Sequence, residues 1–245
     1  MEGLRLDGRV AVVTGGAGAI GAAIGADLAA LGARVVLADV DLPGASKAAA
    51  GLPDARALRV DLAVPESVSA FAAAVGEVHV LVHNAGVSIV RPFTESDPAD
   101  WELMWRVNLR GPMLLTRLLL PGMTAGDGDG WCSSPPTARG PARAARARTR
   151  PPRPGCSAWP RHWPGRPPGR TSPPTWCARA PPTPPMLRRV AEAEPGLVDK
   201  IARGIPLRRL GSPADVAGLV AYLCTERAAY ITGQILSVSG GVTMH

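Results

Sequence analysis

The 245-residue chain lacks long apolar runs and is poor in cysteine and histidine. No run reaches the roughly 18 apolar residues of a membrane span, and no signal-peptide pattern opens the sequence, so we expect no membrane partner and a cytoplasmic location. Cys132, Cys156 and Cys177 lack the paired close spacing of zinc ligands, and the four histidines are scattered. We therefore predict that the protein binds no metal.

Acidic residues and lysine are absent from residues 131–185, which contain 16 prolines and 10 arginines among 55 residues. The rest of the chain has 17 basic and 20 acidic residues, so the overall charge of +7 arises entirely within this stretch. Arginines such as Arg143 and Arg146 leave a nucleic-acid-binding module as an alternative. Because the basicity is confined to one unusual stretch, we predict no nucleic-acid partner. Such a composition resists core formation, so we expect residues 131–185 to be aberrant and disordered.

Outside that stretch the pattern alternates between strands and helices. Short apolar runs predict strands over residues 9–14, 34–39, 57–61 and 78–82, and helical spacing predicts helices over residues 19–31, 65–75 and 98–120. This alternation is typical of an α/β fold, a Rossmann-like doubly wound parallel sheet with helices on both faces. The length suits one domain with a sizeable core, so we expect a single dinucleotide-binding domain over residues 1–245.

A glycine-rich turn over residues 14–21 joins the first predicted strand to the first predicted helix. Glycines permit a tight turn and close approach of a pyrophosphate, and a helix N-terminus offers N–H groups and a positive dipole to the anion. We therefore predict that Gly15, Ala19, Ile20 and Gly21 bind a dinucleotide cofactor. A plain tight turn is the alternative.

Aspartates end the second and third predicted strands. Asp39 lies 18 residues after Gly21, where a carboxylate can accept hydrogen bonds from the adenosine ribose and repel a 2′-phosphate. This favours NAD over NADP, and a solvated strand-end aspartate is the alternative. Asp61 and Leu62 end the third strand, where contact with adenine and a plain loop are equally open.

Several stretches together resemble the classical short-chain dehydrogenases/reductases. Residues 14–21 match the family's cofactor loop, except that Ala19 replaces the usual middle glycine. Residues 83–86, His-Asn-Ala-Gly, are similar to the family's Asn-Asn-Ala-Gly motif, with histidine at its first position. Residues 101–116 resemble the helix that supplies the family's active-site asparagine. Counterparts of its C-terminal helix and last strand lie at residues 206–216 and 230–241.

The resemblance implies a function and further site residues. Asn84, Ala85 and Gly86 would bind the cofactor, and Asn108 would anchor a proton-relay water. The protein would be an NAD-dependent oxidoreductase that interconverts a secondary alcohol and a ketone, with a small-molecule substrate and a homo-oligomeric assembly. The ending over residues 237–244 is similar to dehydrogenases acting on 2-hydroxycyclohexanecarboxyl-CoA, which makes a β-hydroxyacyl thioester a candidate substrate.

The acid/base residues of this family are missing from the chain. The resemblance implies a catalytic tyrosine, a lysine four residues later that lowers its pKa, and a serine about 13 residues before it. Their positions hold Pro136, Thr149 and Arg153, and the chain has only two tyrosines and two lysines, none of which forms such a pair. One interpretation is a catalytically dead, partly folded NAD-binding relative. In it the Pro/Arg-rich stretch replaces the fifth strand, the catalytic helix and the sixth strand, and assembly is in doubt.

A shifted reading frame would account for the missing residues. Trp131 is encoded by TGG and Cys132 begins with TG, so a frame displaced by one nucleotide reads GTG, valine, at position 132. In that frame Pro136, Thr149 and Arg153 can become serine, tyrosine and lysine at the family's spacings. We therefore predict a compensated pair of frameshifts, in the gene or in its sequencing, over about residues 129–185. A genuine Pro/Arg-rich insert is the alternative.

Overall fold

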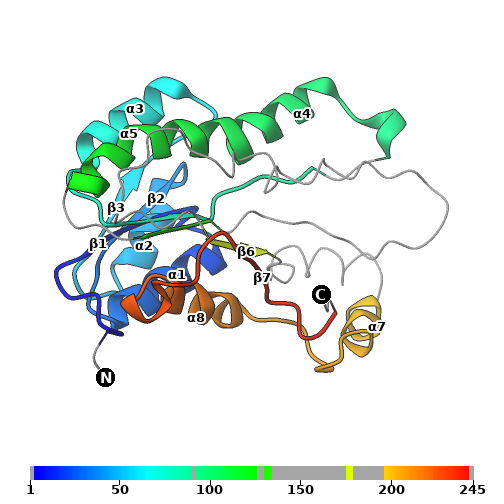
Figure 1. The fold of residues 1–245 in the computed structure, drawn as a ribbon. Helices are drawn as coiled ribbons and strands as arrows, with labels where there is room; N and C mark the ends of the chain where they lie inside the picture. The colour runs from blue at the N-terminus through cyan, green and yellow to red at the C-terminus, as the bar shows by residue number, and fades with distance from the viewer. Residues whose placement is uncertain (1–2, 90–91, 126–129, 134–174, 179–195, 243–245) are drawn as a thin grey trace.

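The computed structural model describes residues 3–89, 92–125, 130–133, 175–178 and 196–242, and a seven-stranded sheet forms its centre (Figure 1). The strand order is β3-β2-β1-β4-β5-β6-β7, and all neighbouring strands run parallel. The strands are β1 (Val10–Thr14), β2 (Arg34–Asp39), β3 (Ala55–Arg59), β4 (Val80–His83), β5 (Gly130–Ser133), β6 (Thr175–Ala178) and β7 (Ile235–Ser237). This sheet confirms the predicted Rossmann-like α/β fold.

Helices cover both faces of the sheet (Figure 1). One face carries α1 (Ala19–Ala30), α2 (Leu42–Ala49) and α8 (Pro213–Leu223), and the other carries α3 (Pro65–Val75) and α5 (Gly111–Ala125). The helix α4 (Pro98–Trp105) continues through the π-helical turn η2 (Arg106–Arg110) into α5. The short elements are η1 (Phe93–Glu95), α7 (Leu197–Arg203) and η3 (Glu226–Ala228).

Alternate residues of the strands feed two separate cores, because successive side chains of a strand point to opposite faces. In β1, Ala11 and Val13 pack with α1 and α8, whereas Val10 and Val12 pack with α3 and α5. All of β1 is buried, as expected of a parallel strand with helices on both sides. This packing holds the carboxyl ends of β1, β2 and β4 along one edge, where ligands bind in sheets of this type.

Two predicted boundaries differ from the structure. The third strand spans Ala55–Arg59 rather than residues 57–61, because its register with β2 begins two residues earlier. The helix predicted over residues 98–120 contains the π-turn η2 and continues beyond Pro121 to the end of α5. Met123 is buried in the core, so burial of this last turn offsets the hydrogen bond that proline cannot donate.

The Pro/Arg-rich stretch contributes two strands, which contradicts the prediction that the fifth and sixth strands are lost. β5 pairs with β4, and β6 joins β5 to β7. Both segments lack proline and contain tryptophan, which favours strands. The prediction of disorder is therefore wrong for residues 131–133 and 175–178. Its other positions, which include Pro136, Thr149 and Arg153, lie outside the described residues.

None of the helices in the described ranges has both the length and the apolar character that crossing a membrane requires. In the same ranges, no three His, Cys, Asp or Glu residues are grouped so that they could hold a metal ion.

Candidate dinucleotide-binding site

The glycine loop between β1 and α1 fits closely between the ends of β2 and β4. Gly15 has a left-handed backbone with φ of +72°, which glycine adopts without strain. Its N–H donates to the Ala38 carbonyl at 2.8 Å, and a Cβ added at Gly15 would lie 2.8 Å from the Ala85 Cα. A Cβ added at Gly16 would lie 2.6 Å from the Leu37 Cβ. The loop therefore requires glycine at both positions.

Helix α1 presents an uncapped N-terminus at the end of this loop. Gly18 is its N-cap, and no side chain hydrogen-bonds to the first turn. The N–H groups that lack intrahelical partners can therefore receive an anion. A Cβ at Gly21 would overlap the Gly15 carbonyl oxygen. Ala19 is exposed and Ile20 is buried in the core, so Ile20 can reach a cofactor only through its backbone. The structure thus brings the four predicted loop residues together.

Thr14 and Asn84 fasten this loop to the end of β4. The Thr14 hydroxyl donates to the Val82 carbonyl and accepts the backbone N–H groups of Asn84 and Ala85, both at 3.1 Å. The side-chain amide of Asn84 donates to the carbonyls of Thr14 at 3.0 Å and Gly15 at 3.2 Å. In these contacts Asn84 and Ala85 support the cofactor loop, and their predicted contact with the cofactor itself stays a prediction.

Asp39 at the end of β2 already accepts two backbone N–H groups. Its Oδ2 accepts the Ala17 N–H at 2.9 Å, and its Oδ1 accepts the Asp41 N–H at 3.0 Å. A carboxylate has about four acceptor positions, so two are left for ribose hydroxyls. The sequence reasoning missed Ala17, because a backbone N–H leaves no signal in a side-chain pattern.

Asp61 and Leu62 differ in what they can offer a ligand. The Asp61 carboxylate is half-buried and accepts the Ala63 N–H at 2.9 Å, while the Asp61 N–H donates to the Ser67 hydroxyl. The Leu62 side chain is buried in the core beside α3 and α5. Contact between Leu62 and adenine would therefore require its backbone, whereas Asp61 stays a side-chain candidate.

Asn108 lies in the π-turn η2 and clamps the segment that follows β4. Its Oδ1 accepts the Val87 N–H, and its side-chain amide donates to the Val87 carbonyl, both at 2.8 Å. Single π-turns occur frequently at functional sites. Within the part of the chain that the structure describes, the buried Ser88 hydroxyl has no hydrogen-bond partner. A buried hydroxyl of this kind requires an explanation, such as a hydrogen bond to a ligand. Ser88 is therefore an additional candidate ligand-binding residue, which the sequence pattern did not indicate.

His83, the first residue of the motif after β4, is a packing residue. Its side chain is buried, and its Nε2 lies 2.8 Å from the Thr116 Oγ1 on α5. Burial lowers the pKa of His83 to about 4, because desolvation disfavours the charged imidazole. His83 is therefore neutral at pH 7 and joins β4 to the helix that follows Asn108.

The tyrosines and lysines of the chain form no acid/base pair. Tyr222 lies on α8, where its hydroxyl donates to the Arg227 carbonyl at 3.4 Å, and Tyr230 is fully exposed. Lys47 lies on α2 and Lys200 on α7. All four residues are among those described, so the present sequence supplies no family-type tyrosine and lysine.

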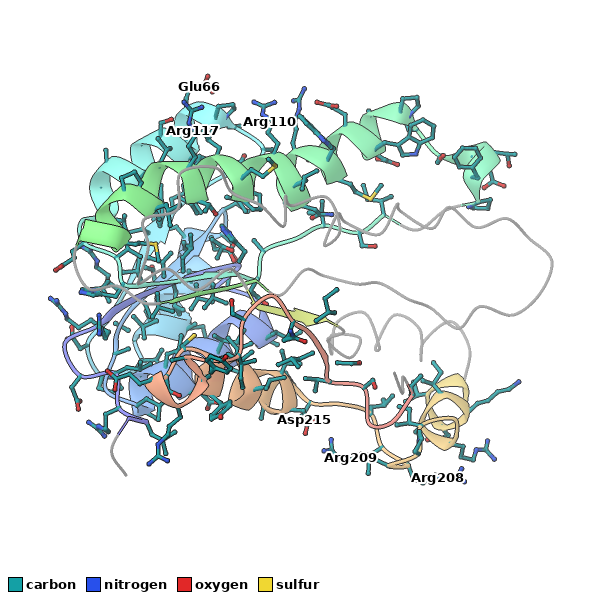
Figure 2. All side chains as sticks on the ribbon, viewed as in Figure 1. Glu66, Arg110, Arg117, Arg208, Arg209 and Asp215 are labelled. Carbon is teal, nitrogen blue, oxygen red and sulfur yellow. The ribbon has the colours of Figure 1, made fainter. Side chains whose placement is uncertain are left out.

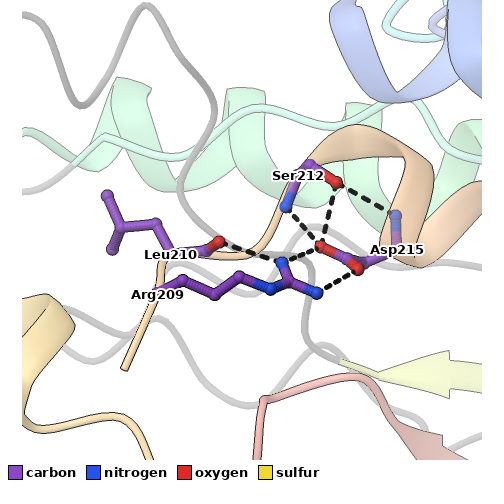
Figure 3. A network of polar contacts seen from close by, with 4 residues as sticks. All are labelled: Arg209, Leu210, Ser212 and Asp215. Atoms are coloured by element: carbon purple, nitrogen blue, oxygen red, sulfur yellow. Dashed lines mark hydrogen bonds and ion pairs between the residues drawn. The ribbon is translucent and has the colours of Figure 1, made fainter. Parts of the chain in front are cut away.

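An ion pair fixes the start of α8, the helix that packs on α1. Ser212 and Asp215 form a capping box, and the Arg209 guanidinium donates to both Asp215 carboxylate oxygens at 2.6 and 2.7 Å (Figure 3). The Arg209 hydrogen bonds, followed by those of Ser212, hold the pKa of Asp215 well below its usual range. Figure 2 shows this pair on the α8 side of the molecule, across the sheet from Arg110 and Arg117. We interpret it as a structural contact that positions α8.

Comparison with family models divides the chain into two matched parts. The model described as short chain dehydrogenase matches residues 9–130. The model described as Enoyl-(Acyl carrier protein) reductase matches residues 179–243. Neither range includes residues 131–178, which form most of the Pro/Arg-rich stretch.

Individual relatives are similar over nearly the whole chain. The 2,3-dihydroxy-2,3-dihydro-p-cumate dehydrogenase of Pseudomonas putida is 33% identical over 98% of this chain and 96% of its own. The galactitol 2-dehydrogenase (L-tagatose-forming) of Cereibacter sphaeroides is 30% identical over 98% and 97%. Among solved structures, the Pseudomonas aeruginosa RhlG/NADP active-site complex has a TM-score of 0.80 at 22% identity and covers 99% of each chain, which shows a shared fold.

Proposed function

Because the chain belongs to the short-chain dehydrogenase family, we propose that it is an NAD-dependent oxidoreductase that interconverts a secondary alcohol and a ketone. One observation carries this proposal. The uncapped first turn of α1 follows a loop that is hydrogen-bonded both to Asn84 after β4 and to Asp39 at the end of β2. A helix N-terminus without a side-chain cap favours an anion such as a pyrophosphate, and a free carboxylate position beside it suits a ribose.

In this proposal the cofactor is NAD rather than NADP. The glycine loop binds the pyrophosphate through backbone N–H groups, and Asp39 accepts the ribose hydroxyls; bound NAD supplies the hydride acceptor. Val40 and Asp41 follow Asp39, so no arginine is next to it and a 2′-phosphate would face two carboxylates. We expect NAD to bind at least roughly tenfold more tightly, which corresponds to about 1.4 kcal/mol. Titration with both cofactors tests this, and equal affinity would refute it.

The substrate in this proposal is a small molecule with a secondary hydroxyl group. The ending over residues 237–244 makes β-hydroxyacyl thioesters the first candidates. The two relatives are named for a cyclic diol and for galactitol. A panel of a 3-hydroxyacyl thioester, a cyclic diol and a polyol therefore covers the proposed classes, and turnover of the thioester alone would support the narrower choice.

The proton-transfer step needs residues that the present sequence does not contain. Thr149 cannot act as a phenolic acid, and Arg153 stays protonated without restoring one. Loss of an acid/base pair removes about 10² to 10⁴ in rate. We propose that a frameshift pair hides the catalytic serine, tyrosine and lysine. The family matches, which end at residue 130 and resume at residue 179, support this location.

A second candidate function is NAD binding without dehydrogenase activity. It is favoured by one observation, that the two tyrosines and two lysines lie on separate elements or exposed segments and form no pair. Under this alternative the cofactor loop and Asp39 retain their binding role. The present chain would then bind NAD and fail to oxidise any alcohol.

Sequencing the gene across codons 125–190 tests the frameshift proposal, and assays of the two chains decide between the two functions. The frameshift proposal expects TAC across the boundary of codons 148 and 149 and AAG across that of codons 152 and 153. Other bases there would refute it and leave the inactive NAD-binding protein. The frame-restored and present chains should then be compared for NAD binding and for NAD reduction. Reduction by the present chain itself would contradict the assignment of the missing tyrosine and lysine.

A homo-oligomeric assembly and a cytoplasmic location complete the proposal. The assembly derives from the family resemblance. Light scattering on the purified frame-restored protein tests the assembly, and a monomer would contradict it. Fractionation of cells that express the gene tests the location.

A further inference from the structure

A series of hydrogen bonds links the glycine loop to the turn between β2 and α2. The Ala17 N–H donates to Asp39 Oδ2 at 2.9 Å, and the Asp41 N–H donates to Asp39 Oδ1 at 3.0 Å. Asp41 caps α2, because its Oδ1 accepts the Gly44 N–H at 3.0 Å. A Cβ added at Gly44 would lie 3.0 Å from the Ala17 Cβ and would overlap the Asp41 carboxylate. We call these four residues the Asp39 ring, because Gly44 leaves no free space for a side chain beside Ala17.

We propose that the Asp39 ring holds the glycine loop in its cofactor-binding shape before the cofactor arrives, with Asp39 as the positioning residue. This inference rests on the proposed NAD site and adds a second role to Asp39 besides the ribose contact. The two roles are compatible, because the backbone N–H groups occupy one position on each carboxylate oxygen and leave the others for hydroxyls.

The expected gain in cofactor affinity arises because the glycine loop is already ordered before the cofactor binds. A mobile loop loses conformational freedom when it closes on a ligand, and that loss weakens affinity. A half-buried carboxylate that accepts two N–H groups forms stronger bonds than a neutral acceptor. Replacing Asp39 should therefore loosen the loop and weaken the binding of both NAD and NADP. It should also reduce the difference in affinity between the two cofactors.

Amide hydrogen exchange in the full-length, cofactor-free protein measures directly how well the Asp39 ring protects the Ala17 N–H. Asp39→Ala removes the acceptor of the Ala17 N–H, so we expect the Ala17 amide to exchange at least about tenfold faster. Asp39→Asn retains one acceptor oxygen and should give an intermediate rate. Gly44→Ala adds a Cβ that crowds the Asp41 carboxylate and the Ala17 Cβ without changing Asp39. It should therefore also accelerate exchange of the Ala17 amide. Lys47→Ala, on the exposed side of α2, is the matched control and should leave the rate unchanged.

Comparing the affinities for two ligands distinguishes a loss of loop positioning from a general loss of structure. NAD carries the pyrophosphate that the loop would hold, whereas adenosine carries the ribose without it. Gly44→Ala should weaken NAD by roughly threefold to tenfold and leave adenosine affinity within error of the wild type. Asp39→Ala should weaken both ligands. Equal weakening of NAD and adenosine in Gly44→Ala would indicate a merely structural effect and overturn the positioning role.

The inference and the proposed function can fail separately. Wild-type rates for the Ala17 amide in both Asp39→Ala and Gly44→Ala would overturn the inference, even if the wild type binds NAD. Failure of the wild type to bind NAD would overturn the proposed function, and the exchange rates would still decide whether the Asp39 ring fastens the loop.

Discussion

Because His83 at the end of β4 is buried, we expect acid to destabilise the protein well above the pH at which carboxylates protonate. His83 is enclosed between β4 and α5, and burial holds its pKa at about 4, compared with about 6.5 in an unfolded chain. Between these values the unfolded state binds a proton that the folded state does not. Stability from this residue is therefore complete above about pH 6.5 and is lost as the pH falls toward 4.

The size of this effect follows from the difference between the two pKa values. Each pKa unit corresponds to about 1.4 kcal/mol, so a complete transition removes about 3 kcal/mol from the free energy of unfolding. At pH 5.5 only part of the transition has occurred, and the loss is about 1 kcal/mol. A small domain has a total stability of only about 5–15 kcal/mol, so even the partial loss is measurable.

Urea unfolding of the wild type and of His83→Asn at pH 7.5, 6.5 and 5.5 isolates the contribution of His83 to the pH dependence of the free energy of unfolding. Asparagine is the family residue that the resemblance places at this position, and it does not titrate in this range. Any cavity that the smaller asparagine leaves changes the free energy of unfolding of the variant by the same amount at every pH. We expect the wild type to lose about 1 kcal/mol more than the variant between pH 7.5 and 5.5. Parallel losses in the two proteins would refute the reasoning.

Other substitutions test the remaining contacts of the site. Asn108→Asp places an acceptor where the side-chain amide donates, so we expect urea unfolding at pH 7 to show a loss of about 1–3 kcal/mol. Gly111→Ala makes its new Cβ overlap the Leu62 carbonyl oxygen and should cost about 1–3 kcal/mol in thermal unfolding, whereas Gly122→Ala has open space and should not destabilise. Burial raises the pKa of Cys224 to about 12, so peptide mapping should find it unlabelled by a thiol reagent at pH 8 until urea unfolds the chain.

The strand, turn and helix around the glycine loop could be predicted from the sequence because their signals are local. An apolar strand, a glycine turn and a helix occupy consecutive residues, and Asp39 ends the next strand at a characteristic distance. The contacts with Ala17 and Val87 could not be predicted in this way. Each uses the backbone N–H of an ordinary apolar residue that is 21 or 22 positions from its partner, so no residue type marks it.

The two strands in the Pro/Arg-rich stretch show a different limit of sequence reasoning. Composition averaged over 55 residues predicts disorder, but a strand needs only a few residues without proline. Gly130–Ser133 and Thr175–Ala178 meet that condition, and β4 and β7 supply backbone partners on either side. Averaged composition therefore hides short segments that long-range pairing can recruit.

Strand pairing and proton transfer place unequal demands on side chains. A parallel ladder is formed by N–H and C=O groups that nearly every residue possesses. Proton transfer requires one phenol with a lowered pKa beside one ammonium group. The proposed frameshift is therefore compatible with β5 and β6, although Thr149 and Arg153 hold the positions that the resemblance assigns to the acid/base pair. The nucleotides that encode these two positions therefore test the proposed frameshift directly.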